Sequence, residues 1–253
     1  MNPRPFILAA AVACALAAAA SARAEAPDWP RVELPRDAQR FDVGQQITVN
    51  GAPMRIQGFV SRSEVADVLA WFRKSLGQPL VENALDGKRI LGRLQGEHYL
   101  TVQLEAVDAG GRQPGTRGLV AVTHLKAAYQ SRDETRDTIE RLLSRMPAGS
   151  QLMSQMSSED GGKLSRHLVF FNRQDESVNI ERIKALMRED GLSFERATGA
   201  DDSTAARVPA SVANGRTLFF KGQGKEAMAV VARDAQGQTA VVMNTVTVVE
   251  RFK

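Results

Sequence analysis

The chain has 253 residues, of which 25% are charged and 43% hydrophobic, with a formal net charge of +4, and these values are typical of a globular protein. The basic residues are scattered and form no run that could follow a phosphate backbone, so nucleic acid is not an expected partner. A single cysteine excludes an internal disulfide framework.

The first residues predict a secretory signal peptide. Arg4 supplies a positive start, residues 6–20 form an uninterrupted apolar run, and Ala22 and Ala24 are the small residues that a signal peptidase requires. The run is shorter than the ~20 residues of a membrane span. We therefore expect residues 1–24 to be removed by cleavage after Ala24, which leaves no stable membrane span and a periplasmic or secreted protein.

Cys14 is not expected to be a lipidation site, because Leu is missing three positions upstream and the apolar run continues beyond it. Cleavage would remove this cysteine, and with it thiol chemistry and cysteine metal sites. Arg4 and Arg23 would leave as well, so that 31 Lys and Arg would face 29 Asp and Glu. Contact with an anionic envelope polymer remains open.

Residues 25–44 predict an extended arm. Pro27, Pro30 and Pro35 fix the backbone and remove hydrogen-bond donors, which disfavours a helix. Trp29 is the large apolar residue of the arm. It either packs back onto the domain or docks a partner.

Residues 45–128 predict a first module. Alternating residues on both sides of Asn50 and Gly51 indicate a hairpin with a tight turn. A helix follows, with Ser61 and Glu64 as a capping box and Gly77 as its end. Three strands are then expected, over residues 89–94, 99–106 and 118–125.

Residues 129–147 predict a bridging helix, and residues 148–253 predict a second module in the same order. A hairpin around residues 160–162 precedes a helix over 177–190 and strands over 217–221, 227–232 and 239–249. The last strand is apolar at consecutive positions, which predicts cover on both faces. Residues 197–214 are polar and small, and predict a mobile loop. The expected fold class is therefore α+β, an internal duplication of two similar modules that each contain a hairpin, a helix and three antiparallel strands.

The sequence offers no established catalytic pattern. His98, His124 and His167 lack metal-ligand spacing, and neither Gly-x-Ser-x-Gly nor Ser-x-x-Lys occurs. We expect no catalytic residue, no metal and no cofactor. His98 and His124 lie at predicted strand ends that can meet at one rim of a sheet, so they remain candidates for ligand contact.

Three functions remain. The preferred one is a non-enzymatic envelope protein that presents sheet faces or edges to an envelope protein partner, as an assembly or accessory factor does. The second is a periplasmic binder of a small or anionic polymeric ligand in a cleft between the modules, with Arg89 and Arg216 as repeat-related anion contacts. The third is a hydrolase with an unrecognised site. The candidate contact residues are Trp29, Arg89, Arg216, His98 and His124.

Overall fold

A computed structural model describes residues 29–107, 115–199 and 215–249. The predicted signal peptide, Cys14 and the cleavage point after Ala24 lie outside these residues, as does most of the predicted loop over 197–214. No helix within the described ranges is long and apolar enough to cross a membrane.

The described residues form twelve strands and four helices. The strands are β1 (Gln39–Val49), β2 (Ala52–Ser61), β3 (Val81–Leu85), β4 (Lys88–Gln95), β5 (His98–Val107), β6 (Gly115–His124), β7 (Gln151–Asp160), β8 (Lys163–Asn172), β9 (Ser193–Thr198), β10 (Arg216–Gly222), β11 (Lys225–Arg233) and β12 (Thr239–Val248). The helices are α1 (Val65–Leu76), α2 (Leu125–Gln130), α3 (Arg132–Ser144) and α4 (Glu176–Glu189).

All twelve strands belong to one sheet, in the order β3-β4-β5-β6-β2-β1-β7-β8-β12-β11-β10-β9. Every neighbouring pair is antiparallel. The fold-class prediction of two separate α+β modules with three-strand units is therefore wrong, and the duplication is not supported in that form. The prediction fails at the centre of the molecule, where β1 pairs with β7 over residues 46–49 and 156–159. This pairing joins the strands of both halves into one sheet.

The predicted hairpins and most strands are present. Asn50 and Gly51 take positive φ angles of 49° and 81° in the tight turn between β1 and β2. The two edge strands, β3 and β9, were not predicted, and their side chains are almost all exposed. Without a buried face, neither strand has the alternation of apolar and polar residues that identified the others.

Two separate hydrophobic cores lie on one face of the sheet. In the first half, α1 packs Phe72 and its neighbours against β4, β5 and β6, where the sheet contributes Val102 and Leu104 among others. In the second half, α4 packs Ile183 against Phe170 and the strands β9 and β11. Only one side of β12 is fully buried, through residues such as Val241, so its predicted cover on both faces is wrong.

The start of α1 differs from the predicted capping box. Glu64 occupies the N-cap position without a side-chain hydrogen bond to the helix. The Ser61 hydroxyl instead donates to Asp37 Oδ2 at 2.6 Å, and this bond ties the arm to the end of β2. Gly77 ends the helix with φ 70°, as predicted, and its N–H donates to the Arg73 carbonyl.

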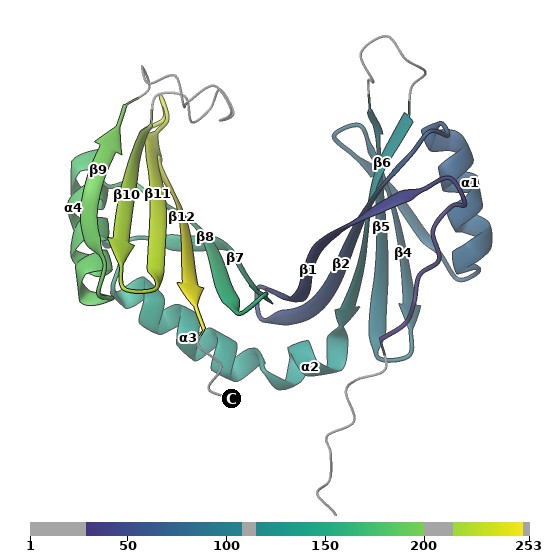
Figure 1. The fold of residues 1–253 in the computed structure, drawn as a ribbon, viewed down its shortest axis with the longest axis horizontal. Helices are drawn as coiled ribbons and strands as arrows, with labels where there is room; N and C mark the ends of the chain where they lie inside the picture. Colours follow the sequence, from purple (N-terminus) through teal and green to yellow (C-terminus); the bar gives the residue numbers. More distant parts are fainter. Residues whose placement is uncertain (1–28, 108–114, 200–214, 250–253) are drawn as a thin grey trace, which may run out of the picture.

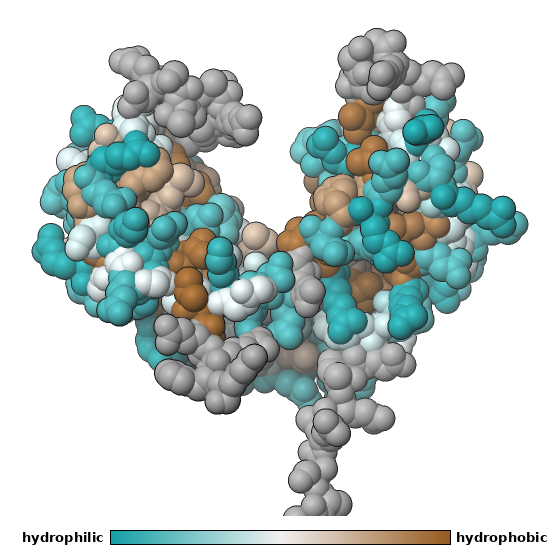
Figure 2. All heavy atoms as spheres, viewed as in Figure 1, coloured by the Kyte–Doolittle hydropathy of each residue, from teal (hydrophilic) through white to brown (hydrophobic). Residues whose placement is uncertain are grey.

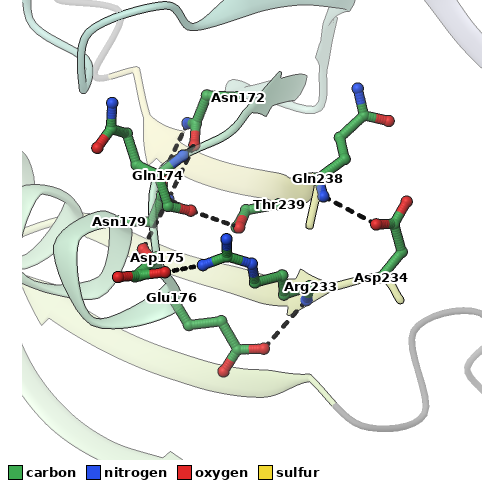
Figure 3. Close-up of polar contacts among 9 residues, drawn as sticks. All are labelled: Asn172, Gln174, Asp175, Glu176, Asn179, Arg233, Asp234, Gln238 and Thr239. Carbon is green, nitrogen blue, oxygen red and sulfur yellow. Dashed lines mark hydrogen bonds and ion pairs between the residues drawn. The ribbon is translucent and has the colours of Figure 1, made fainter. Parts of the chain in front are cut away.

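A polar network holds the start of α4 against the turn between β11 and β12 (Figure 3). The buried amides of Asn172 and Asn179 exchange two hydrogen bonds, at 2.7 and 3.0 Å. The buried Thr239 hydroxyl donates to the Gln174 carbonyl at 2.6 Å. Buried polar groups require such partners, so this network fixes the helix on its side of the sheet.

The molecule is U-shaped (Figure 1). Helices α1 and α4 lie at its two outer sides, and α2 and α3 run along its base between β6 and β7. The Ser131 side chain makes no capping hydrogen bond to α3, and its hydroxyl lies 3.2 Å from the Gly51 carbonyl, to which it donates. This contact attaches the base to the β1–β2 turn. The sheet face without helices is consequently turned toward the inside of the U.

Candidate functional site

One face of the sheet is left uncovered by helices α1 and α4, which lie on the other side. Its residues follow from the strand register, because directly paired residues in antiparallel strands point to the same face. They are the residues that alternate with the two cores. We call this surface the inner face; Phe41, Val60, Leu94, His167 and Met228 are representative residues.

In the first half of the sheet, aromatic rings lie over glycines on the inner face. The Phe41 ring covers Gly58, where an added Cβ would come within 2.1 Å of the ring. The Tyr99 hydroxyl lies equally close to the Cβ position of Gly92. These glycines leave room for broad, flat aromatic surface, and the Phe41 residue remains 43% exposed.

In the second half, one row of paired residues crosses the inner face. It runs through Arg196, Phe219, Met228, Asn244, His167 and Met156. The Arg196 guanidinium lies 3.9 Å from the centre of the Phe219 ring. The row therefore combines apolar side chains with hydrogen-bonding groups, and it spans this half from its edge strand β9 to the central strand β7.

Large apolar side chains are exposed on the inner face in both halves. Their exposed fractions reach 58% at Leu94, 41% at Val60 and 38% at Met228. Figure 2 shows the molecule hollowed between its two ends, with hydrophobic residues beside this hollow. Exposed apolar side chains on an uncovered sheet face are able to contribute to a protein–protein interface.

The charges of the inner face largely compensate one another across the strands. Arg117 pairs with Glu105 at 3.5 Å. Asp160 lies opposite Lys163, and Lys221 lies opposite Glu226. The surface therefore has little net charge, which favours a partner with apolar groups over a polyanion.

The structure places three of the predicted contact residues together, on the opposite, helix-covered side. The ring centres of Trp29 and His98 are 5.3 Å apart, those of Trp29 and His124 are 5.9 Å apart, and the two histidines are separated by 4.6 Å. Arg55 lies over the Trp29 ring at 5.0 Å. Trp29 also packs against the first core, which matches the interpretation that it folds back onto the domain.

Two neighbouring contacts fix this cluster. His124 Nδ1 accepts a hydrogen bond from the Ala127 N–H at 3.1 Å and so caps α2. Next to it, the hydrogen bond from the Lys126 ammonium holds the pKa of Glu97 below its usual value. The cluster has a clear packing role, and its role in ligand contact stays a prediction.

Arg89 and Arg216 are not brought together. Arg89 lies on β4 near Glu82, with 3.7 Å between the charged groups, whereas Arg216 begins β10 near the other end of the sheet. Both point to the helix-covered side, since their partners Leu104 and Val231 belong to the two cores. They therefore do not face a shared cleft inside the U.

The arm borders a second surface, which was not predicted from the sequence. Two hollows, of about 510 and 1050 Å³, adjoin along it and share Arg31, Val32 and Glu33. Arg93 and Lys74 line the smaller hollow. The larger one is lined by Trp29 and by three further arginines, Arg36, Arg40 and Arg55. Arg55, Lys74 and Arg93 are far from the arm in the sequence, so no local motif could have identified the whole surface.

Among the described residues, no group of three or more His, Cys, Asp or Glu side chains is arranged to hold a metal ion. His167 and Ser165 both belong to the inner face through their pairing with β12. They are half-buried residues of the sheet surface there. The third function, a hydrolase with an unrecognised site, stays a prediction.

Comparisons with known proteins assign this chain to no family. No protein-family model matches the chain, and no curated protein matches it either. Among solved structures, the apo structure of the immunity protein TplEi of the T6SS from Pseudomonas aeruginosa matches with 13% sequence identity over 87% of this chain and 85% of that one, at a TM-score of 0.27. At that score the match supports no argument about fold or function.

Proposed function

We propose that this protein is a non-enzymatic interaction module that holds one protein partner against its inner face. The observation that supports the proposal is an uncovered sheet face with exposed apolar side chains in both halves, on a molecule whose helices α1 and α4 lie on the other side. Burial of such apolar area is the main driving force of protein association. The compensated charges at its margins fit the polar rim of an interface.

The proposed partner is a protein of the bacterial envelope, because the predicted signal peptide directs the chain out of the cytoplasm. It would enter the U and touch both walls, Val60 on one and Met228 on the other. Contact with both walls distinguishes this mode from binding at an exposed sheet edge, which would involve β3 or β9 only.

Photo-crosslinking in intact cells of the native host tests the proposal. A photoreactive amino acid is placed at Val60, at Met228, and, as a control, at Val178, which is 46% exposed on the outer helix α4. We expect positions 60 and 228 to crosslink to the same protein and position 178 to give no such product. Different products from the two walls, or the same product from position 178, would contradict the proposal.

Charge substitutions give a quantitative second measurement. Val60→Glu and Met228→Glu each place a carboxylate in the proposed interface, where desolvation without a partner is costly. Recovery of the crosslinked partner by affinity purification is expected to fall by about tenfold, which corresponds to about 1.4 kcal/mol. Val178→Glu, of matched chemistry and exposure, is expected to leave the recovery unchanged.

A further inference from the structure

The two hollows beside the arm form one continuous basic surface, which we call the arm groove. Its cations are Arg31, Arg36, Arg40, Arg55, Lys74 and Arg93. Glu33 and Asp42 are the acidic residues of the same lining. The arm holds this surface open because Val32 and Leu34 pack inward on the first core, while the alternating Arg31 and Glu33 remain exposed.

None of these cations forms an ion pair with another described residue. Elsewhere on the described surface, arginines such as Arg73, Arg145 and Arg182 pair with carboxylates. A cluster of like charges without counterions raises the local potential and attracts anions. The arm groove thus concentrates positive charge on a protein whose formal net charge is only +4.

One of the arginines of the arm groove has a buried N–H group that lacks a hydrogen-bond acceptor among the described residues. Arg93 Nε is buried and has no hydrogen-bond partner among the described residues. A buried guanidinium N–H without an acceptor is costly, and such an atom calls for a missing partner. Arg93 also lines the smaller hollow, where its guanidinium is placed to bind a carboxylate of a ligand.

The rest of the lining narrows the class of ligand. Apolar side chains also line the larger hollow, among them the half-buried Val32 and Leu34 of the arm, and a phosphate polymer could not use them. The Trp29 ring already contacts Arg55 and the rings of His98 and His124, so it is not a free stacking surface for a sugar. A peptide that alternates acidic and apolar side chains satisfies both the cations and the apolar lining.

We propose that the arm groove is a second binding site, which takes an acidic peptide segment with interspersed apolar residues. It lies on the helix-covered side of the first half of the sheet, away from the inner face, so it does not depend on the interface proposed above. Its occupancy would leave the hollow of the U free for the other partner.

Fluorescence anisotropy on the purified chain tests this site. The probe is a short labelled peptide in which Glu and Leu alternate, compared with the same peptide containing Lys in place of Glu. We expect the Glu peptide alone to bind, with an affinity that falls as salt is raised. Arg31→Gln with Arg40→Gln is expected to raise its Kd by about tenfold or more. Arg93→Gln is expected to raise the Kd as well without lowering the melting temperature, since it removes an unsatisfied group.

The matched control is Arg132→Gln with Arg136→Gln, which removes the same charge from the exposed helix α3 and is expected to leave the Kd unchanged. Equal binding of the Lys peptide, or an equal loss in the α3 control, would overturn the proposal. Polyphosphate is titrated in parallel: if it binds with the same sensitivity to Arg31 and Arg40 and the Glu peptide does not bind, the groove is a phosphate site and the proposal is wrong. Val60→Glu on the inner face is expected to leave peptide binding intact, which separates this result from the fate of the interface.

Discussion

Asp37 is the residue that attaches the arm to the first half of the sheet. Its Oδ2 accepts hydrogen bonds from the Ser61 hydroxyl at 2.6 Å, from the Arg62 N–H at 3.0 Å and from the Ser63 hydroxyl at 3.2 Å. The Ser61 hydrogen bond is the main cause that lowers the pKa of Asp37 below its usual value. Because these donors favour the ionised carboxylate, the arm is held by a charge-dependent contact.

The stability of this contact is expected to depend on pH. A carboxyl group whose pKa is lowered by folding stabilises the protein above its unfolded pKa, near ~3.9, and loses that contribution as the pH falls through the folded value. Asp37→Asn should therefore lower the urea midpoint at neutral pH and differ little from wild type below about pH 3. Asp86→Asn is the control, because Asp86 lies in an exposed turn with φ 49° that Asn adopts equally well. A constant difference at all pH values would show that the charge of Asp37 is not involved.

Paired strands approach closely at glycines that admit an aromatic ring. Gly118 on β6 lies under Phe59, and Gly58 on β2 lies under Phe41, each with 2.1 Å between the Cβ position and the ring. The two rings differ in how far they can move away from the glycine. Phe59 is fully buried in the first core, whereas Phe41 is 43% exposed on the inner face and can turn toward solvent.

This difference predicts unequal costs for the same substitution. Gly118→Ala should destabilise the protein by about 1–3 kcal/mol, because the buried ring of Phe59 cannot move away from the added methyl group. Gly58→Ala should stay within about 1 kcal/mol of wild type, since Phe41 can swing outward and Ala restricts the unfolded chain. Urea unfolding of the two variants measures both values. Equal destabilisation would mean that Phe41 is held as firmly as Phe59.

The elements predicted correctly are those whose own residues show a characteristic pattern within a short stretch of sequence. The Asn50–Gly51 turn, the apolar face of α1 and the alternation along β5 are all visible in short stretches of sequence. The pairing of β1 with β7 is not, because it joins residues more than a hundred positions apart and nothing in either strand specifies its neighbour. The sequence therefore indicated most strands but divided them into the wrong number of sheets.

The same limit applies to the candidate sites. His98 and His124 could be expected to meet, because both lie at ends of strands that follow one another in the chain, and they are directly paired in β5 and β6. The inner face and the arm groove depend on which side of the sheet the helices cover and on where the arm lies. Arg31, Arg55 and Arg93 come from three different segments, and only the folded chain makes them neighbours.

At the scale of the whole molecule, the sheet is continuous but its cores are not. One core surrounds Phe59 and Leu104, the other surrounds Phe170 and Leu218, and no described residue belongs to both. The link between them is narrow, since β1 and β7 pair over residues 46–49 and 156–159. Asn50 extends this link by hydrogen bonds with the backbone of Gln155.

This arrangement predicts that the two halves open separately under native conditions. Leu104→Ala and Leu218→Ala each remove a fully buried side chain, at a cost of about 2–5 kcal/mol to the half that contains it. In hydrogen exchange followed by mass spectrometry, Leu104→Ala should lower protection in β4, β5 and β6 and leave β10, β11 and β12 close to wild type; Leu218→Ala should do the reverse. If either variant lowered protection evenly across all twelve strands, the junction between β1 and β7 would couple the halves into one cooperative unit. Separate opening would instead let the two walls of the inner face adjust independently to a partner, because they are joined through the short β1–β7 junction and the helical base below it.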